Sequence, residues 1–204
     1  MSINPLLLTY LLANFDSNKK NFGIINDAIF NDLLFFLSHS NVKIINNRID
    51  KSIHNKLSIA LIAIQNGVDL FSICSKINWH DFELFSSELL RLHDYNVFTN
   101  FRIKNPKREI DVIGIKSGNA LLFDCKHWKN RSIYGLRKII DKQKSRTALF
   151  VQKSQITIKH AFPIILTFLP NCYEFVDNVP IVSIEKLNSF LLDFDGVNDN
   201  FYRI

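Results

Sequence analysis

The sequence predicts an α/β protein in which a small all-helical N-terminal region, residues 1–78, precedes a larger domain, residues 79–204, built on a mixed β-sheet. Three observations predict this class. Apolar residues recur at helical spacing throughout the first region. From residue 80 on, a helix is followed by three extended segments, a second helix, further strands and a final helix. Hydrophobic residues make up 47% of the chain, enough for a sizeable core.

The N-terminal region is expected to be helical because its apolar residues fall on one face of each helix. Gly67 follows the third of these helices, where a C-terminal cap often needs a residue with positive φ. The region has no residues in a catalytic pattern. It either assists substrate binding or dimerisation or acts as a packing cap, and the sequence leaves these alternatives open. The expected helices cover about residues 6–15, 25–37, 53–65 and 70–76.

The second domain is expected to open with a helix that Asp81 caps at its N-terminus and that buries Phe82, Phe85 and Leu89. An extended segment begins at Tyr95 and ends at a turn that contains a proline. A later helix places Gln143 on its apolar face. The elements expected after residue 129 are a helix over 132–147, strands at 149–151, 163–168 and 179–182, and a helix over 184–192.

A predicted hairpin over residues 109–129 carries charged side chains where a buried strand should be apolar. Asp111 lies in the first strand, and Asp124 and Lys126 lie in the second. Because strand side chains alternate, Asp124 and Lys126 point to the same face. An unpaired charge on a buried strand is costly, so these residues need partners. They form either a cross-strand salt-bridge cluster or a metal site.

Two carboxylates on neighbouring strands, together with a main-chain carbonyl, supply the hard oxygen ligands that Mg²⁺ prefers. Such an ion polarises a phosphate and lowers the pKa of a water molecule, which makes a nucleophile at neutral pH. A lysine beside the carboxylates, here Lys126, orients that water or offsets charge that develops on the phosphate. These residue types therefore indicate phosphodiester chemistry.

The segments Phe82-Glu83, Asp94 to Val97, Glu109 to Ile113 and Leu122 to Lys126 resemble the motifs of the PD-(D/E)xK nuclease superfamily. Within it, the chain is most similar to the Mrr-like restriction endonucleases and the archaeal Holliday junction resolvases. The resemblance covers roughly residues 79–192 and implies a restriction-endonuclease-like core.

The resemblance assigns a role to each of five residues. Asp111 and Asp124 match the motif acids and would bind Mg²⁺, for which Mn²⁺ is a substitute, and Lys126 matches the motif lysine. Glu83, twelve residues before an aromatic residue, matches the helix acid and would be an auxiliary ligand through water. Gln143, seventeen residues after the motif lysine, would contact the site or the scissile phosphate.

The sequence also departs from the family pattern. An Asp stands at position 124 where this branch usually has Glu or Gln, Ile110 replaces the motif proline, and Asp94 replaces the usual glycine. None of these changes removes a charged ligand.

Basic residues are concentrated around the same hairpin, as expected for a surface that neutralises phosphates. Residues 102–159 contain 15 Lys and Arg against 4 Asp and Glu, a net charge of +11, whereas the whole chain carries +6. Cys125 is rejected as a nucleophile because alternation turns it away from Asp124. The residues expected to bind nucleic acid are Lys107, Arg108, Lys129, Arg131, Lys138, Lys142 and Arg146.

The sequence therefore predicts a metal-dependent endodeoxyribonuclease of the restriction or DNA repair type, acting on double-stranded or branched DNA. The alternatives are a catalytically inactive DNA-binding module and a junction-specific resolvase, which would act as a two-fold homodimer. No apolar run approaches the roughly 18–20 residues that span a bilayer. The three cysteines form no disulfide or metal-binding pattern, so a cytoplasmic protein without membrane association is expected.

Overall fold

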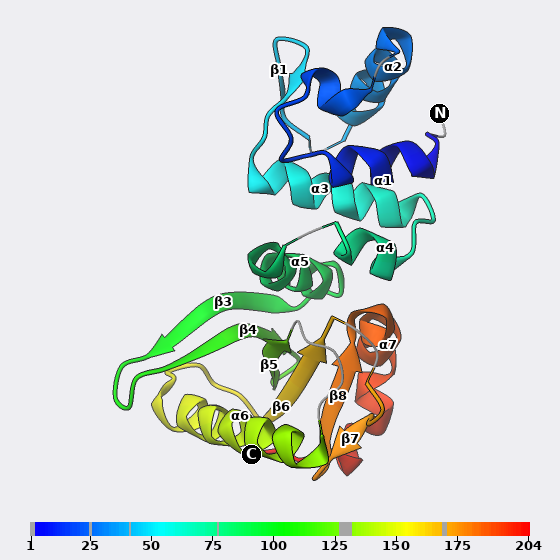
Figure 1. Cartoon of the computed structure of the whole chain (residues 1–204). Coiled ribbons are helices and arrows are strands. Elements are labelled where there is room, and N and C mark those ends of the chain that lie inside the picture. Colours follow the sequence, from blue (N-terminus) through cyan, green and yellow to red (C-terminus); the bar gives the residue numbers. More distant parts are fainter. Residues whose placement is uncertain (1–2, 25, 41, 77, 127–131, 169–170) are drawn as a thin grey trace. The chain divides into compact units, whose positions relative to one another are not determined.

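The computed structural model describes residues 3–24, 26–40, 42–76, 78–126, 132–168 and 171–204. The chain divides into two compact units, Met1–Asp81 and Phe82–Ile204 (Figure 1). The domain boundary predicted after residue 78 stays a prediction. Among the described helices, none has the length and apolar character needed to cross a membrane.

The first unit is mainly helical, as predicted. Its elements are α1 (Pro5–Ala13), η1 (Lys20–Gly23), α2 (Asp27–Ser38), β1 (Ile44–Ile45), β2 (Arg48–Ile49), α3 (Ile53–Gln65) and α4 (Leu70–Cys74). Helix α3 has the predicted bounds, and Gly67 follows it with a φ of 88°, which confirms its capping role. The short antiparallel pair β1–β2 was not predicted. Its turn, Asn46-Asn47, has positive φ at both positions, a conformation that asparagine tolerates.

A buried lysine pairs with two aspartates of the first unit, one of which lies in the first turn of α5 (Trp79–Leu92). Lys56 is 3% exposed, and its Nζ lies 2.9 Å from Asp81 Oδ2 and 2.6 Å from Asp16 Oδ2. The prediction that Asp81 caps α5 is therefore wrong. The helix begins earlier, and Asn78 Oδ1 accepts the Asp81 N–H. The Asp81 side chain is buried with Lys56 because this buried ammonium needs a counter-charge.

The second unit is built on a six-stranded mixed sheet with the order β3-β4-β5-β6-β8-β7. Strands β3, β4 and β5 are antiparallel neighbours, β5, β6 and β8 are parallel, and β7 pairs antiparallel with β8. This arrangement confirms the predicted α/β class with a restriction-endonuclease-like core. The strands are β3 (Asn96–Ile103), β4 (Arg108–Lys116), β5 (Asn119–Lys126), β6 (His160–Thr167), β7 (Phe175–Val176) and β8 (Val179–Ser183).

Helices cover both faces of this sheet (Figure 1). Helix α6 (Ile133–Lys153) packs its Phe150 into a buried cluster with Leu122 of β5. On the other face, Leu90 of α5 approaches Gly114 so closely that a Cβ there would lie 3.4 Å from its methyl groups. Phe162 of β6 packs on that face against Phe194 of α7, with ring centroids 5.0 Å apart. The remaining elements are η2 (Ile184–Lys186), α7 (Leu187–Val197) and η3 (Asn198–Asn200).

The segment 149–151, predicted as a strand, is helical. Helix α6 continues to Lys153 because Phe150 extends the buried stripe of Gln143 and Thr147 at helical spacing. The local preference of Leu-Phe-Val for a strand is overridden by this packing against the sheet. The closing helix likewise extends beyond residue 192, to Val197.

Replacing Lys56 by Met is expected to destabilise the first unit by about 3 kcal/mol, because it leaves the 6%-exposed Asp81 side chain buried without a counter-charge. Chemical denaturation followed by circular dichroism measures this loss. Lys43→Met, at an exposed lysine of the same unit, is the matched control. The double variant Lys56→Met/Asp81→Asn should recover part of the loss. Equal stability of Lys56→Met and Lys43→Met would contradict the account.

Candidate active site

The buried carboxylate of Asp124 is the centre of the charged cluster. Asp124 is 2% exposed, and its Oδ1 accepts hydrogen bonds from Lys126 Nζ at 2.8 Å and from Arg146 Nη1 at 2.7 Å. Asp124 and Lys126 point to the same side of β5, as alternation predicts. Neither of these hydrogen bonds uses Oδ2 of Asp124, so this oxygen is available to bind a cation.

Asp111 lies beside Asp124 at the point where β4 and β5 separate. The paired register of these strands stops at Val112 and Phe123, and the N–H of Cys125, two residues further along β5, donates to Asp111 Oδ2 at 2.8 Å. On the other side, the register of β3 with β4 skips Asn100, which has a φ of 51°. The backbone is therefore irregular on both sides of Asp111, and irregular strands are common beside functional sites.

The two carboxylates are only partly compensated by the cations. Burial, and then the charge of Asp124, raise the pKa of Asp111 to about 6, although the hydrogen bond from Cys125 and the charges of Lys126 and Arg146 act against the shift. Asp111 therefore holds its proton more readily than an exposed aspartate does. A cation bound here would relieve the repulsion between the two acids.

Gln143 and Arg146 connect helix α6 to these acids. Gln143 is fully buried, its Nε2 donates to the carbonyl of Leu122 at 2.8 Å, and its Oε1 accepts from Arg146 Nη1 at 3.3 Å. Gln143 thus reaches Asp124 through Arg146. Sequence reasoning assigned Arg146 to phosphate binding and missed its ion pair with Asp124. The available signal was its position three residues after Gln143 on one helix.

Glu83 lies on α5 within electrostatic range of β5. Burial raises the pKa of the Cys125 thiol well above its ordinary value, and the charges of Asp111, Glu83 and Asp124 raise it further. The thiol is thus kept neutral, which agrees with its rejection as a nucleophile. Among the described residues, no group of three or more His, Cys, Asp or Glu side chains is placed to hold a metal ion. A ligand role for Glu83 remains a prediction.

The residues present fit a divalent cation held by two carboxylates. Asp111 and Asp124 supply hard oxygen ligands, and Asp124 Oδ2 takes no part in either ion pair. Burial, and then the charge of Asp124, raise the pKa of Asp111, so a cation bound beside it would favour its ionised form. The same carboxylates also fit the alternative of a salt-bridge cluster, because Asp124 already has two cationic partners.

Four of the predicted nucleic-acid contacts lie on or next to β4 and α6, the elements that carry Asp111 and Arg146. Lys107 and Arg108 are exposed at the start of β4, and Lys138 and Lys142 are exposed on α6. Lys138 also lies over the ring of Tyr134 at 4.6 Å. The two other predicted contacts, at positions 129 and 131, lie outside the described residues.

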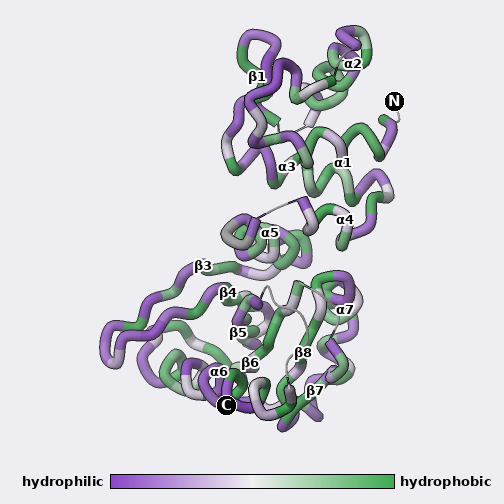
Figure 2. The backbone as a smooth tube through the Cα atoms, viewed as in Figure 1, coloured by the Kyte–Doolittle hydropathy of each residue, from purple (hydrophilic) through white to green (hydrophobic). Residues whose placement is uncertain are grey.

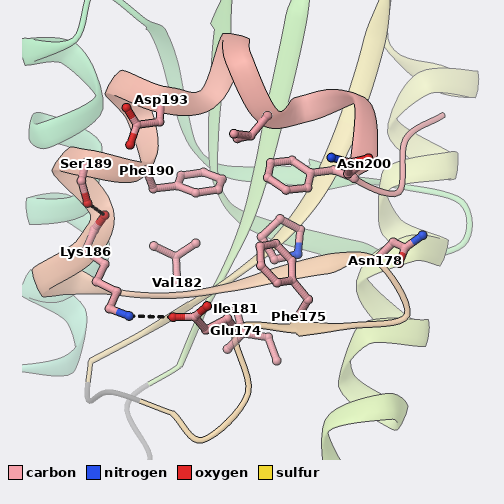
Figure 3. A pocket seen from close by; sticks show the side chains of 13 residues that line it. Glu174, Phe175, Asn178, Ile181, Val182, Lys186, Ser189, Phe190, Asp193 and Asn200 are labelled. Carbon is pink, nitrogen blue, oxygen red and sulfur yellow. Dashed lines mark hydrogen bonds and ion pairs between the residues drawn. The ribbon is translucent and has the colours of Figure 1, made fainter.

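A cavity of about 580 Å³ lies elsewhere in the second unit, between β7, β8 and the elements that follow them (Figure 3). Apolar side chains such as Phe175, Phe190 and Val182 line it, and an ion pair between Lys186 and Glu174 lies at its edge. It contains none of the predicted site residues, so the sequence-predicted chemistry is not in this cavity.

Comparison with known proteins relates the carboxylate-bearing segment to nucleases. Residues 79–165, less than half of the chain, match the family model of the nuclease-related domain (NERD). This segment contains all five predicted catalytic residues. An uncharacterised protein of Archaeoglobus fulgidus is 28% identical over 119 residues, which span 56% of this chain and 90% of that protein.

Two solved structures give weaker matches. Can2 from Sulfobacillus thermosulfidooxidans, solved in complex with cyclic tetra-adenylate, is 18% identical with a TM-score of 0.39, over 93% of this chain and 50% of Can2. Protein VC1899 from Vibrio cholerae is 13% identical with a TM-score of 0.36, over 98% of this chain and 58% of that protein. This chain thus spans about half the length of each.

Asp111→Asn is expected to stabilise the metal-free protein at pH 7.5 and to leave its stability unchanged near pH 4. Because folding raises the pKa of Asp111 from 3.8 to about 6, the stability that its proton provides is present below about pH 4 and is lost as the pH rises through 6. The gain at pH 7.5 should be on the order of 1–2 kcal/mol. Denaturant unfolding in EDTA at both pH values measures it.

Asp141→Asn, at an exposed aspartate of α6, is the control and should change stability little at either pH. A marked loss of stability in Asp111→Asn at pH 7.5 would show instead that Asp111 is part of a stabilising salt-bridge cluster.

Proposed function

We propose that this protein is a metal-dependent endodeoxyribonuclease that hydrolyses DNA phosphodiester bonds. The observation that supports this most strongly is the convergence of Asp111, Asp124 and Lys126 at the end of β5, within the segment that matches the nuclease-related domain. Carboxylates beside a lysine, in a domain with a basic surface, are suited to binding and cleaving a phosphodiester.

Asp111 and Asp124 would hold Mg²⁺, or Mn²⁺ in its place, and Glu83 would assist through a water molecule. When bound, the ion supplies Lewis-acid polarisation of the phosphate and lowers the pKa of the attacking water. Lys126 has a quarter of its side chain exposed, so its ammonium can orient that water or stabilise charge on the phosphate. The carboxylates must be ionised to hold the ion, so protons compete with the ion for Asp111 and binding of the ion should weaken as the pH falls.

Gln143 would act on the position of Asp124, whereas Arg146 would both hold Asp124 and contact a phosphate. Gln143 is buried and fixed to the β5 backbone, and it holds Arg146 against Asp124. Arg146 is itself 24% exposed, and its guanidinium has further donors with which to contact a phosphate. Lys138 and Lys142 on the exposed face of α6, with Lys107 and Arg108, would contact flanking phosphates.

A second function, DNA binding without cleavage, is favoured by one observation. Two protein cations already meet the charge of Asp124. Such a module would bind DNA with a steep dependence on salt and would not hydrolyse it with any divalent metal.

The finer assignment to the Mrr-like endonucleases or to the junction resolvases concerns the substrate. A resolvase should prefer four-way junctions to linear duplex and act as a homodimer, because paired nicks need two sites related by a two-fold axis. A restriction-type or repair enzyme should cleave linear duplex DNA without needing a four-way junction.

Asp111→Asn and Lys126→Ala are each expected to lower the rate of plasmid cleavage in Mg²⁺ by a hundredfold or more, because each removes a group that acts in the transition state. Gel assays on plasmid, single-stranded and four-way junction DNA, with Mg²⁺, Mn²⁺ and EDTA, measure this. Lys159→Gln, an exposed lysine at the other end of β5 and β6, is the control and should cleave like wild type.

Titration calorimetry with Mn²⁺ separates the two functions. The nuclease proposal predicts a binding site that is lost in Asp111→Asn. Wild-type protein that binds DNA but neither binds Mn²⁺ nor cleaves any substrate would favour the binding module. Variants that cleave as fast as wild type would refute the proposed mechanism.

A further inference from the structure

We propose that the end of the β3–β4 hairpin is a rigid basic ribbon that enters the major groove of double-helical DNA and fixes the duplex relative to Asp111. The basic ribbon comprises residues 100–111, that is, the last residues of β3, the turn, and the first residues of β4. This inference rests on the proposed function, since it takes DNA as the substrate, and it deepens that proposal by specifying the duplex form.

The ribbon is a two-stranded extension of the sheet. Strand β3 stays paired with β4 as far as Ile103 and Arg108, whereas the pairing of β4 with β5 stops at Val112. Residues 108–110 of β4 therefore pair with β3 alone and extend for about 10 Å at the usual rise of a strand. The hairpin lies at the margin of the sheet in Figure 1. Asp111 is at its base, so the candidate metal ligand and the ribbon share one strand.

Packing against α6 makes the ribbon rigid. The ring of Phe101 lies edge-on to that of Phe150 on α6 with centroids 5.2 Å apart, and Ile103 and Ile110 are buried in the same cluster. At the turn, Lys153 at the end of α6 donates a hydrogen bond to the carbonyl of Asn105. A rigid element loses little conformational entropy on binding, which favours a role in recognition.

The exposed end of the ribbon is strongly basic. Arg102, Lys104, Lys107 and Arg108 are all exposed, and the hairpin end is hydrophilic in Figure 2. Glu109 is the single acid among residues 102–109, and it pairs with Arg102 at 3.4 Å. Within the described part of the chain, the other three cations take part in no ion pair with a carboxylate. Their charge is therefore available for phosphates.

These dimensions and side chains favour duplex DNA over other nucleic acids. The major groove of B-DNA is about 12 Å wide and admits a two-stranded β-ribbon. The major groove of A-form RNA is too narrow for side chains to read. Proteins that bind single strands stack bases on exposed aromatic rings, whereas the turn, residues 104–107, has no aromatic residue and Phe101 packs on Phe150.

The test is the binding of a duplex of about 20 base pairs and of one of its single strands, measured by fluorescence anisotropy in EDTA so that no cleavage occurs. Lys104→Gln/Lys107→Gln should bind the duplex about tenfold or more weakly near 0.1 M salt. A plot of the log of the duplex association constant against log salt should become less steep by about 2, because each lysine accounts for about one phosphate contact. Affinity for the single strand should change much less.

Lys159→Gln/Arg203→Gln removes the same charge near the start of β6, at the other end of this strand from the ribbon, and should keep wild-type duplex affinity within about twofold. Thermal unfolding of both variants confirms that they fold. The ribbon proposal is overturned if the turn variant binds duplex like the control variant. Equal losses on duplex and single strand overturn it as well, since they indicate a general basic surface.

The result is independent of the proposed function, because binding is measured without hydrolysis. Duplex binding that depends on the turn, in a protein that cleaves nothing, would support the ribbon and refute the nuclease. Cleavage that is insensitive to the turn variant would support the nuclease and refute the ribbon.

Discussion

The burial of the Asp124 carboxylate is the constraint on which the second unit depends. An ionised carboxylate that is 2% exposed requires cationic partners, and the fold provides them from two directions. Lys126 comes from the same strand and Arg146 from helix α6. Gln143 joins α6 to β5 by donating to the Leu122 carbonyl, and it accepts a hydrogen bond from Arg146 on its own helix. The charged cluster thereby couples the helix to the strand that carries the site.

A second constraint is the separation of β5 from the first residues of β4, those that precede Val112. Because the ladder stops there, the Cys125 N–H needs another acceptor, and the Asp111 carboxylate supplies it. The same separation leaves the start of β4 paired with β3 alone, which produces the basic ribbon. One break in the sheet thus brings the second acid to Asp124 and creates the surface that we infer to hold DNA.

Much of this architecture follows from local patterns in the sequence. Periodicity predicts α3 and the order of elements in the second unit, and alternation puts Asp124 and Lys126 on one face. The errors and omissions arose where distant contacts decide the outcome. Asp81 turns to Lys56, 25 residues away, and Arg146 pairs with Asp124, 22 residues away. Residues 149–151 favour a strand locally, but Phe150 belongs to the buried stripe of α6. The catalytic roles of Glu83 and Gln143 stay predictions. They were assigned from the family resemblance and not from a local pattern in the sequence.

The most direct test of the central claim is a crystal structure of the protein grown with Mn²⁺ and measured at the manganese absorption edge. The account predicts an anomalous peak between the carboxylates of Asp111 and Asp124, with Lys126 or Arg146 drawn away from Asp124. Anomalous density absent from this position at saturating Mn²⁺, with both cations still bound to Asp124, would contradict it and identify the cluster as a structural salt bridge.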